Sequence, residues 1–250
     1  MPKVSINILT KNRAELLKKA LASVEAQTFR DFEVVVVDDG STDNTQEIIE
    51  SFSAEGGHLN IKIFKHPQSI GITLSRQEAL GKSAGEYVAI LDDDDEWVDV
   101  NKLKKQVEFL NTHPDCVLVG GGMRVEDRFQ MTNYKFRPET DKIIRQTMLS
   151  RNNFFTSAVM FKRAAAIKAG GFIIDGADLA EDYDLWLRLG LLGKMRNFQE
   201  VFTAYRAPSY NKDKFKQFLQ KQLTLISKHK NDYPGYWSAK IILVLRMFLN

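Results

Sequence analysis

Four consecutive aspartates, Asp92–Asp95, follow the apolar run Tyr87–Leu91. Adjacent carboxylates repel one another, and a loop gains no stability from holding them together. A hard divalent cation relieves that repulsion, because Mg²⁺ or Mn²⁺ takes oxygen ligands and is commonly held by one or two carboxylates together with substrate phosphates. In an extended segment residues two apart face the same side, so Asp92 and Asp94 are expected to face the ligand together. The competing interpretation is a solvated acidic turn.

Two further acidic pairs leave their chemistry open. Asp38-Asp39 follow the run Phe32–Val37 and suit a turn or a helix cap, although a carboxylate there would also accept a hydrogen bond from a nucleobase N–H. Glu181-Asp182 stand before a helical stripe of apolar residues, where acidic side chains favour the helix N-terminus. One of them would equally serve as a general base that deprotonates an attacking hydroxyl. The residues alone do not decide between these roles.

Strand-like and helix-like runs alternate along the first 120 residues and are expected to position these clusters. Apolar β-branched runs predict strands, and apolar residues at a spacing of 3.6 predict helices. The expected strands are Val4–Thr10, Phe32–Val37, Asn60–His66, Tyr87–Leu91 and Val117–Val119, and the expected helices are Arg13–Gln27, a helix ending at Phe52, Thr73–Ser83 and Asp99–Thr112. This order predicts an α/β fold with a mostly parallel, doubly wound central sheet flanked by helices. Ligands of such sheets bind beyond the carboxyl ends of the strands, where the acidic clusters lie.

The composition is that of an ordinary globular protein. The chain has 250 residues, of which 44% are hydrophobic and 27% charged, and a net charge of +3 is too small to indicate a nucleic-acid partner. The single cysteine, Cys116, excludes an intrachain disulfide and a multi-cysteine zinc site. The four histidines show no metal-ligand spacing and are expected on the surface. Met1-Pro2-Lys3 lead directly into the first strand, and no apolar run reaches the roughly 18 residues of a membrane span, so a cytoplasmic protein is expected.

Taken in order, the motifs closely resemble those of family-2 glycosyltransferases with the GT-A fold. Each motif is short, but their order and spacing together are specific, and the resemblance covers about residues 3–207. The matching segments are Thr10–Arg13, Val35–Asp43, Gly71–Arg76, Leu91–Trp97, Gly170–Phe172, Glu181–Arg188 and Tyr205-Arg206. Two positions depart from the family pattern, since Gln77 stands where Asn is frequent and Pro208 where His is frequent.

The resemblance implies a metal-dependent glycosyltransferase that inverts the anomeric carbon. The expected donor is a nucleotide-diphosphate sugar, a UDP-sugar first of all, and the acceptor is a hydroxyl of a carbohydrate or lipid-linked molecule in bacterial-type polysaccharide or glycoconjugate synthesis. The donor-binding residues that it implies are Thr10, Asn12, Arg13, Asp39, Arg76, Asp92 and Asp93. Among these, Thr10 and Asp39 would hold the nucleobase, Arg76 would lie near the diphosphate, and Asp92 would approach the ribose. Asp94 would bind Mn²⁺ or Mg²⁺, Asp182 would be the general base, and Glu181 would line the acceptor pocket.

Residues 1–210 are expected to form the catalytic domain, with a nucleotide-binding half at about 1–120 and an acceptor-side half at about 121–210. The stretch 122–150 mixes polar, basic and aromatic residues and is expected to be irregular. Residues 211–250 read as a basic amphipathic helical tail, which either packs on the domain or lies on an anionic membrane at its inner face.

Two other protein classes compete with the transferase. A non-catalytic module that binds sugar nucleotides would keep the cleft without turnover, but such a module has no need of the Glu181-Asp182 pair. A nucleotidyltransferase would carry a glycine-rich first loop, whereas the first strand here ends in Thr10-Lys11-Asn12-Arg13.

Overall fold

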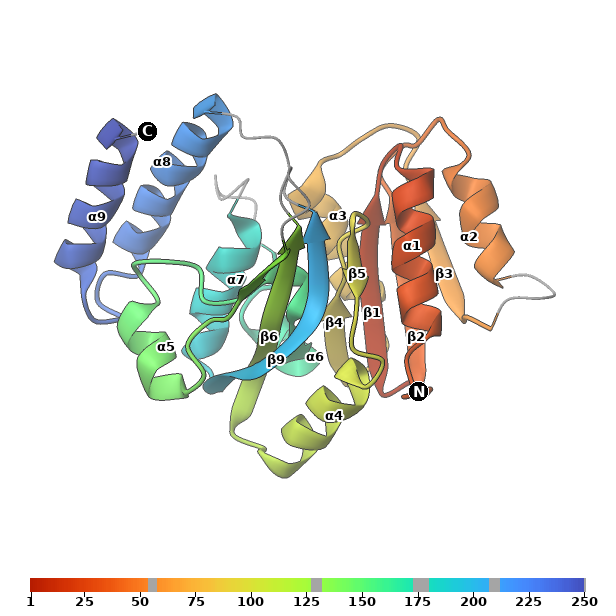
Figure 1. Ribbon diagram of the computed structural model, residues 1–250, viewed down its shortest axis with the longest axis horizontal. Coiled ribbons are helices and arrows are strands. Elements are labelled where there is room, and N and C mark those ends of the chain that lie inside the picture. Colours follow the sequence, from red (N-terminus) through yellow and green to blue (C-terminus); the bar gives the residue numbers. More distant parts are fainter. Residues whose placement is uncertain (54–57, 127–131, 173–179, 207–211, 250) are drawn as a thin grey trace.

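The computed structural model of the protein describes residues 1–53, 58–126, 132–172, 180–206 and 212–249. Its strands form one curled sheet with helices around it (Figure 1). The strands are β1 (Val4–Thr10), β2 (Phe32–Asp38), β3 (Ile61–Lys65), β4 (Tyr87–Ile90), β5 (Asp95–Trp97), β6 (Cys116–Glu126), β7 (Thr132–Lys135), β8 (Met160–Lys162) and β9 (Lys194–Arg206). The helices are α1 (Ala14–Glu25), α2 (Thr45–Ser53), α3 (Ile72–Lys82), α4 (Lys102–Thr112), α5 (Asp141–Thr147), η1 (Thr156–Ala158), α6 (Arg163–Lys168), α7 (Glu181–Gly190), α8 (Lys212–Lys228) and α9 (Tyr236–Leu249).

The sheet has two halves of different character. Its order is β3-β2-β1-β4-β8-β6-β9-β5, with β7 beside β6. The pairs among β3, β2, β1 and β4 are all parallel, which confirms the α/β fold expected from the alternating runs. In the second half β8 runs antiparallel to both β4 and β6, β5 runs antiparallel to β9, and only β6 and β9 are parallel. The doubly wound arrangement therefore belongs to the nucleotide-binding half predicted from sequence.

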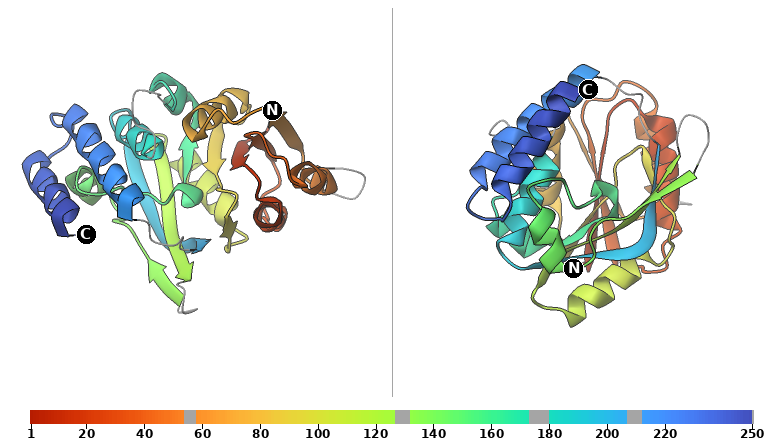
Figure 2. Two further views of the ribbon diagram at one scale, coloured as in Figure 1. Left: turned by 90° about the horizontal axis from the view of Figure 1, so that it is seen from above. Right: turned by 60° about the vertical axis from the view of Figure 1, so that its left-hand side comes forward.

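Helices cover both faces of this sheet (Figure 2). In β4, Val88 and Ile90 pack in the apolar cluster that α7, α8 and α9 cover, whereas Tyr87 and Ala89 pack in the cluster under α1 and α4. Successive strand residues point to opposite faces, so a strand with both faces covered needs apolar residues at every position. This is why the run Val34–Val37 of β2 is unbroken.

The stretch 122–150 is more regular than its composition predicts. The strand β6 continues to Glu126 and pairs antiparallel with β7, and α5 follows. Three consecutive glycines interrupt the apolar pattern of β6, and a Cβ at Gly121 would lie 2.2 Å from Cδ2 of Phe202. Glycine is depleted in strands, so the residues that allow this close packing also hide the strand from a propensity scale. The prediction of an irregular segment is wrong for this reason.

The tail forms a helical hairpin that packs on the rest of the protein. Leu225 and Ile226 of α8 and Leu243 of α9 are buried in the cluster that also holds α7. Figure 1 shows both helices together beyond α5 and α7, at the end of the molecule far from α1 and α2. Among the helices described, none combines the length and apolar character needed to cross a bilayer.

Candidate functional site

A cleft lies beyond the carboxyl ends of β1, β2 and β4. It encloses about 560 Å³, a size typical of small-molecule sites. Six of the residues expected to bind the donor or the metal line it: Thr10, Arg13, Asp39, Asp92, Asp93 and Asp94. Lys11, Ser69, Gly71, Ser75 and Tyr205 also line it, although no individual role is expected for them from the sequence. Most of these residues lie within or beside the recognised motifs, and this position in the sequence could have identified them as cleft residues.

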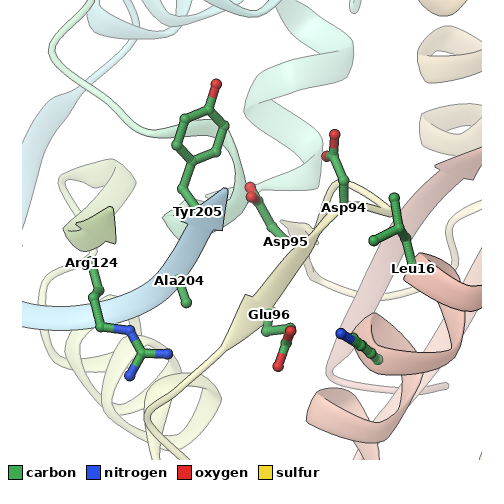
Figure 3. A pocket seen from close by; sticks show the side chains of 8 residues that line it. Leu16, Asp94, Asp95, Glu96, Arg124, Ala204 and Tyr205 are labelled. Carbon is green, nitrogen blue, oxygen red and sulfur yellow. The ribbon is translucent and has the colours of Figure 1, made fainter. Parts of the chain in front are cut away.

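The aspartate quartet forms a turn and not the extended segment expected. The N–H of Asp95 donates to the carbonyl of Asp92 at 3.1 Å, and β5 begins at Asp95. In Figure 3 the side chains of Asp94, Asp95 and Tyr205 point to one side of β5 and β9, and those of Glu96 and Arg124 point to the other side. The segment turns because the chain reverses direction between β4 and β5. This reversal is needed for β5 to pair antiparallel with β9. Asp92 and Asp94 nevertheless both reach the cleft.

Arg13 balances part of the acidic charge. Its Nη1 lies 2.9 Å from Oδ1 of Asp93 and 3.0 Å from Oδ2 of Asp94. In the described part of the chain, no group of three or more acidic, histidine or cysteine side chains converges as a metal cage. Mg²⁺ and Mn²⁺ do not need one, because one or two carboxylates and the substrate phosphates suffice. Asp94, which keeps 39% of its side chain exposed, therefore fits such an ion together with Asp92.

The last member of the quartet differs from the others. Asp95 is buried, and its Oδ2 lies 2.5 Å from the Oγ of Ser157. Burial, aided by the nearby charge of Asp92, raises the pKa of Asp95 to about 8. A carboxyl with that pKa is mostly protonated at neutral pH, so it adds little to the negative charge of the turn.

Arg76 joins the cleft to the start of α7. Its Nη2 donates to Oδ1 of Asp92 at 2.9 Å, and its Nε donates to Oε1 of Glu181 at 3.1 Å. The side chain is buried, and its third nitrogen, Nη1, has no hydrogen-bond partner among the described residues. Burial alone would lower the pKa of Arg76, but the carboxylates of Asp92 and Glu181 outweigh it and raise the pKa. Arg76 is itself not among the residues that line the cleft, so its permanently charged guanidinium contacts the cleft through Asp92.

Asp182 and Glu181 lie side by side at the beginning of α7. Oδ2 of Asp182 accepts a hydrogen bond from Oγ1 of Thr156 at 2.5 Å. Burial raises the pKa of Glu181 although Arg76 opposes that change. The pair thus meets Arg76 of α3, which the sequence could not show. Neither residue lines the cleft, and the link between the pair and the cleft is the contact of Arg76 with both Glu181 and Asp92.

Asp39 is held by the loop before α3. Its two carboxylate oxygens accept hydrogen bonds from Oγ of Ser69 at 2.5 Å and from the N–H groups of Ile70 at 2.8 Å and Gly71 at 3.1 Å, and Nδ1 of His66 lies 2.9 Å away. Burial alone would raise the pKa of Asp39, but these hydrogen bonds lower it to about 2. A carboxylate offers about four acceptor positions, so all are engaged. A nucleobase N–H would have to displace one of these donors.

His66 bridges two carboxylates, and the prediction that all four histidines lie on the surface is wrong for it and for His229, which is buried beside Asp184 and Asp232. Its side chain is only 12% exposed, and its Nε2 lies 2.6 Å from Glu78 while Nδ1 faces Asp39. Both nitrogens donate only in the protonated ring. Burial alone would lower the pKa of His66, but the hydrogen bonds to Glu78 and Asp39 raise it.

The contribution of His66 to stability is expected to depend on pH. A histidine whose pKa is raised by folding stabilises fully below its unfolded pKa of about 6.5, and this stabilisation is lost as pH rises through the raised value. Urea unfolding of the native protein and His66→Gln is therefore expected to show a larger difference in the free energy of unfolding at pH 6 than at pH 9. His58→Gln, at an exposed histidine, should show no such trend. An equal difference at both pH values for His66→Gln would contradict the bridge.

Three predicted positions have other placements. Asn12 is not among the residues that line the cleft, and its Oδ1 accepts a hydrogen bond from the N–H of Thr42 at 2.8 Å, which ties the loops after β1 and β2 together. Gln77 accepts a hydrogen bond from the N–H of Phe172 at 2.7 Å and so positions the segment after α6. Pro208 lies outside the described residues.

The site and sheet define a GT-A nucleotide-sugar transferase fold, and similarity to known proteins agrees. The model of the family described as "Glycosyl transferase family 2" matches residues 5–170. UDP-Glc:alpha-D-GlcNAc-diphosphoundecaprenol beta-1,3-glucosyltransferase WfaP from Escherichia coli is 31% identical over 230 residues, or 91% of this chain and 87% of WfaP. Protein Rv1520 of Mycobacterium tuberculosis, uncharacterized, is 29% identical over 206 residues, and the match spans 81% of this chain and 58% of Rv1520.

A solved structure supports the fold independently. The mannosyltransferase PcManGT from Pyrobaculum calidifontis, in complex with GDP-Man and Mn²⁺, superposes with a TM-score of 0.71 at 22% identity, covering 99% of this chain and 70% of the other. The chain belongs to glycosyltransferase family 2 and has the GT-A fold. It is therefore a glycosyltransferase, with relatives that act in glycoconjugate synthesis.

Proposed function

We propose that the protein transfers a sugar from a nucleotide-diphosphate donor in the cleft to an acceptor hydroxyl beside Asp182, with inversion at the anomeric carbon. The observation that carries this proposal is the double contact of Arg76 with Asp92 and Glu181. Asp92 belongs to the donor cleft, and Glu181 is the neighbour of Asp182. One buried side chain thus brings the leaving-group side and the acceptor side of a displacement reaction together.

Each half of the reaction has suitable groups. In the donor cleft, Thr10 would hold the base together with Asp39, which would exchange one of its present donors for the base N–H, and Arg13 and Asp93 form part of the cleft wall. The Nη1 of Arg76, unpaired within the described chain, is suited to a phosphate oxygen. Asp94, with Asp92, would hold Mn²⁺ or Mg²⁺, which when bound supplies Lewis-acid stabilisation of the departing diphosphate. On the acceptor side, Asp182 would take the hydroxyl proton, its Oδ2 oriented by Thr156.

A UDP-sugar is the first donor to test. The name of WfaP specifies UDP-glucose, whereas PcManGT was solved with GDP-mannose, so both nucleotides belong in the screen. The assay measures release of nucleoside diphosphate from UDP- and GDP-sugars with Mn²⁺ and a panel of glycosyl acceptors. The anomeric proton of the product, followed by NMR, should show a β-linkage from an α-linked donor. Tight nucleotide binding without turnover on any acceptor would favour the non-catalytic module instead.

Removal of the metal is expected to abolish this turnover, and removal of its proposed ligand is expected to weaken activation by the metal. EDTA should stop product release and added Mn²⁺ should restore it. Asp94→Asn should raise the Mn²⁺ concentration needed for half-maximal rate by at least the ~10-fold that even outer-shell changes cost. Asp115→Asn, at an exposed aspartate in an ion pair with Lys194, is the matched control and should behave as native. Full activity in EDTA would contradict the assignment of Asp94.

We further propose that the exposed face of α9, in the tail 211–250, rests on an anionic membrane. Trp237, Ile241 and Leu245 recur at intervals of four and are 70%, 60% and 53% exposed. Lys240 lies 5.4 Å from the Trp237 ring, which gives the stripe a basic edge. Apolar residues with flanking lysines favour the interface of anionic bilayers.

Flotation with vesicles of phosphatidylglycerol and phosphatidylcholine tests this contact. The native protein should float with the vesicles and the triple variant Trp237→Ser, Ile241→Ser, Leu245→Ser should not. Ile167→Ser removes an equally exposed apolar residue elsewhere and should have no effect. A triple variant that floats like the native protein, or a native protein that forms dimers through this face in sedimentation, would rule the membrane contact out.

A further inference from the structure

A second pocket adjoins the donor cleft and reaches Thr156, a contact of the proposed base. It encloses about 290 Å³ and shares Asp92 and Tyr205 with the cleft. Its lining includes Thr156, the residue that donates to Oδ2 of Asp182. If Asp182 is the general base, the acceptor molecule must occupy this pocket. The identification of the occupant as the acceptor rests on the proposed function. The charge of the pocket is independent of that function.

The pocket wall carries basic side chains. Arg137 and Lys135 line it, and the guanidinium of Arg137 stands 4.5 Å from the centre of the Phe155 ring. Nε of Arg137 is buried and has no hydrogen-bond partner among the residues that the structure describes. Burial, together with the charge of Arg151, lowers the pKa of Arg137. Across the described ranges, none of these three side chains forms an ion pair with a carboxylate.

The carboxyl groups of the same pocket are already engaged. Asp92 lies 2.9 Å from Nη2 of Arg76, and Asp95 lies 2.5 Å from Oγ of Ser157. Within the described part of the chain, the positive side of the pocket therefore has no counter-charge. Buried or half-buried cations are normally paired, because desolvation is costly without a partner. An anion that arrives with the ligand would complete the site.

We propose that this pocket binds a phosphate group of the acceptor, with Arg137 as the main ligand and Lys135 beside it. Two cations lining one pocket favour phosphate over a carboxylate, since a phosphate monoester carries up to two negative charges and three strong acceptor oxygens. Arginine matches two of these oxygens in one plane. The acceptor is then a phosphorylated sugar, whose phosphate joins it either to a lipid carrier or to the next unit of a polymer.

Binding of small probes tests the pocket without knowledge of the natural acceptor. Calorimetry on protein saturated with UDP and Mn²⁺ compares glucose 1-phosphate with uncharged methyl α-glucoside. The phosphate should bind at least about tenfold more tightly, as charge-assisted hydrogen bonds require, and NaCl at about 0.5 M should weaken this preference. Arg137→Gln should abolish the preference and Lys135→Gln should reduce it. Lys142→Gln, at an exposed lysine outside the pocket, should retain it.

The outcomes separate this proposal from the donor assignment. Equal binding of the two glucosides, or an unchanged preference in both Arg137→Gln and Lys135→Gln, would overturn the phosphate site. Lys135 is exposed, so its variant remains informative should Arg137→Gln fail to fold. Failure of UDP to bind would count against the donor cleft alone, and the same titrations on the unliganded protein would still decide the pocket. Octyl phosphate and glycerophosphoglycerol then distinguish the lipid source from the polymer, and preferential binding of either one supports the site.

Discussion

Asp182→Asn is expected to lower kcat by ~10²- to 10⁴-fold, the range that removal of a general base produces. Asparagine keeps the size of the side chain and its contact with Thr156, but it cannot accept the hydroxyl proton at neutral pH. Asp182 does not line the donor cleft, so the dissociation constant of the sugar nucleotide should stay within a factor of about two, well under the tenfold that 1.4 kcal/mol would cause. Steady-state kinetics and calorimetry measure the two quantities separately.

The matched control for this loss is Asp213→Asn, which removes one exposed carboxylate outside the site. It should leave both kcat and donor binding at native values. If Asp182→Asn turns over at the native rate, Asp182 is not the general base, and Glu181 is the next residue to replace. A parallel loss of donor binding would instead show that Asp182 supports the cleft itself.

Arg76→Gln is expected to reduce the free energy of unfolding by ~3–5 kcal/mol, as removal of one member of a buried ion pair does. The substitution leaves the carboxylates of Asp92 and Glu181 without their shared cation in a site where Arg76 is only 5% exposed. Urea unfolding at pH 7.5 measures the loss. The loss should shrink near pH 5, because protonation of the buried Glu181, whose pKa burial already raises, removes its unpaired charge.

Two further variants test the size of the stability loss expected for Arg76→Gln. Lys194→Gln breaks an exposed ion pair with Asp115 and should not change stability measurably. Arg76→Lys keeps the charge but cannot reach both carboxylates with a planar fork, so it should recover only part of the stability. A loss for Arg76→Gln no larger than that for Lys194→Gln would mean that Arg76 does not hold the two halves of the site together.

The parallel half of the fold was predictable because its signals are local. Unbroken β-branched runs such as Phe32–Val37 occur where both faces of a strand are covered, and they alternate with amphipathic helices. The antiparallel half lacked that pattern. The glycines at 120–122 make room for Phe136, Phe202 and Asn197, and their strand is recognisable only from the residues packed against it.

Some donor-site residues could be predicted from the sequence and others could not, again because only local signals are visible along the chain. Asp92, Asp93 and Asp94 line the cleft as expected, since the end of a buried strand already places them there. The role of Asn12 depends on the loop of Thr42, thirty positions away, and that of His66 on Glu78 and Asp39. No spacing rule reveals contacts between loops that meet only after folding.

By itself, the amino-acid sequence determined the α/β class, the strand ends where ligands bind and the acidic cluster suited to a divalent cation, because each depends on neighbours along the chain. Only the tertiary structure decided which acidic groups act together. Glu181 meets Arg76 across 105 positions, and Arg137 stands in the pocket next to Thr156. The reason is physical: the charge balance of a buried site depends on distances in space, and these are set by the packing of α3 and α7 against one sheet.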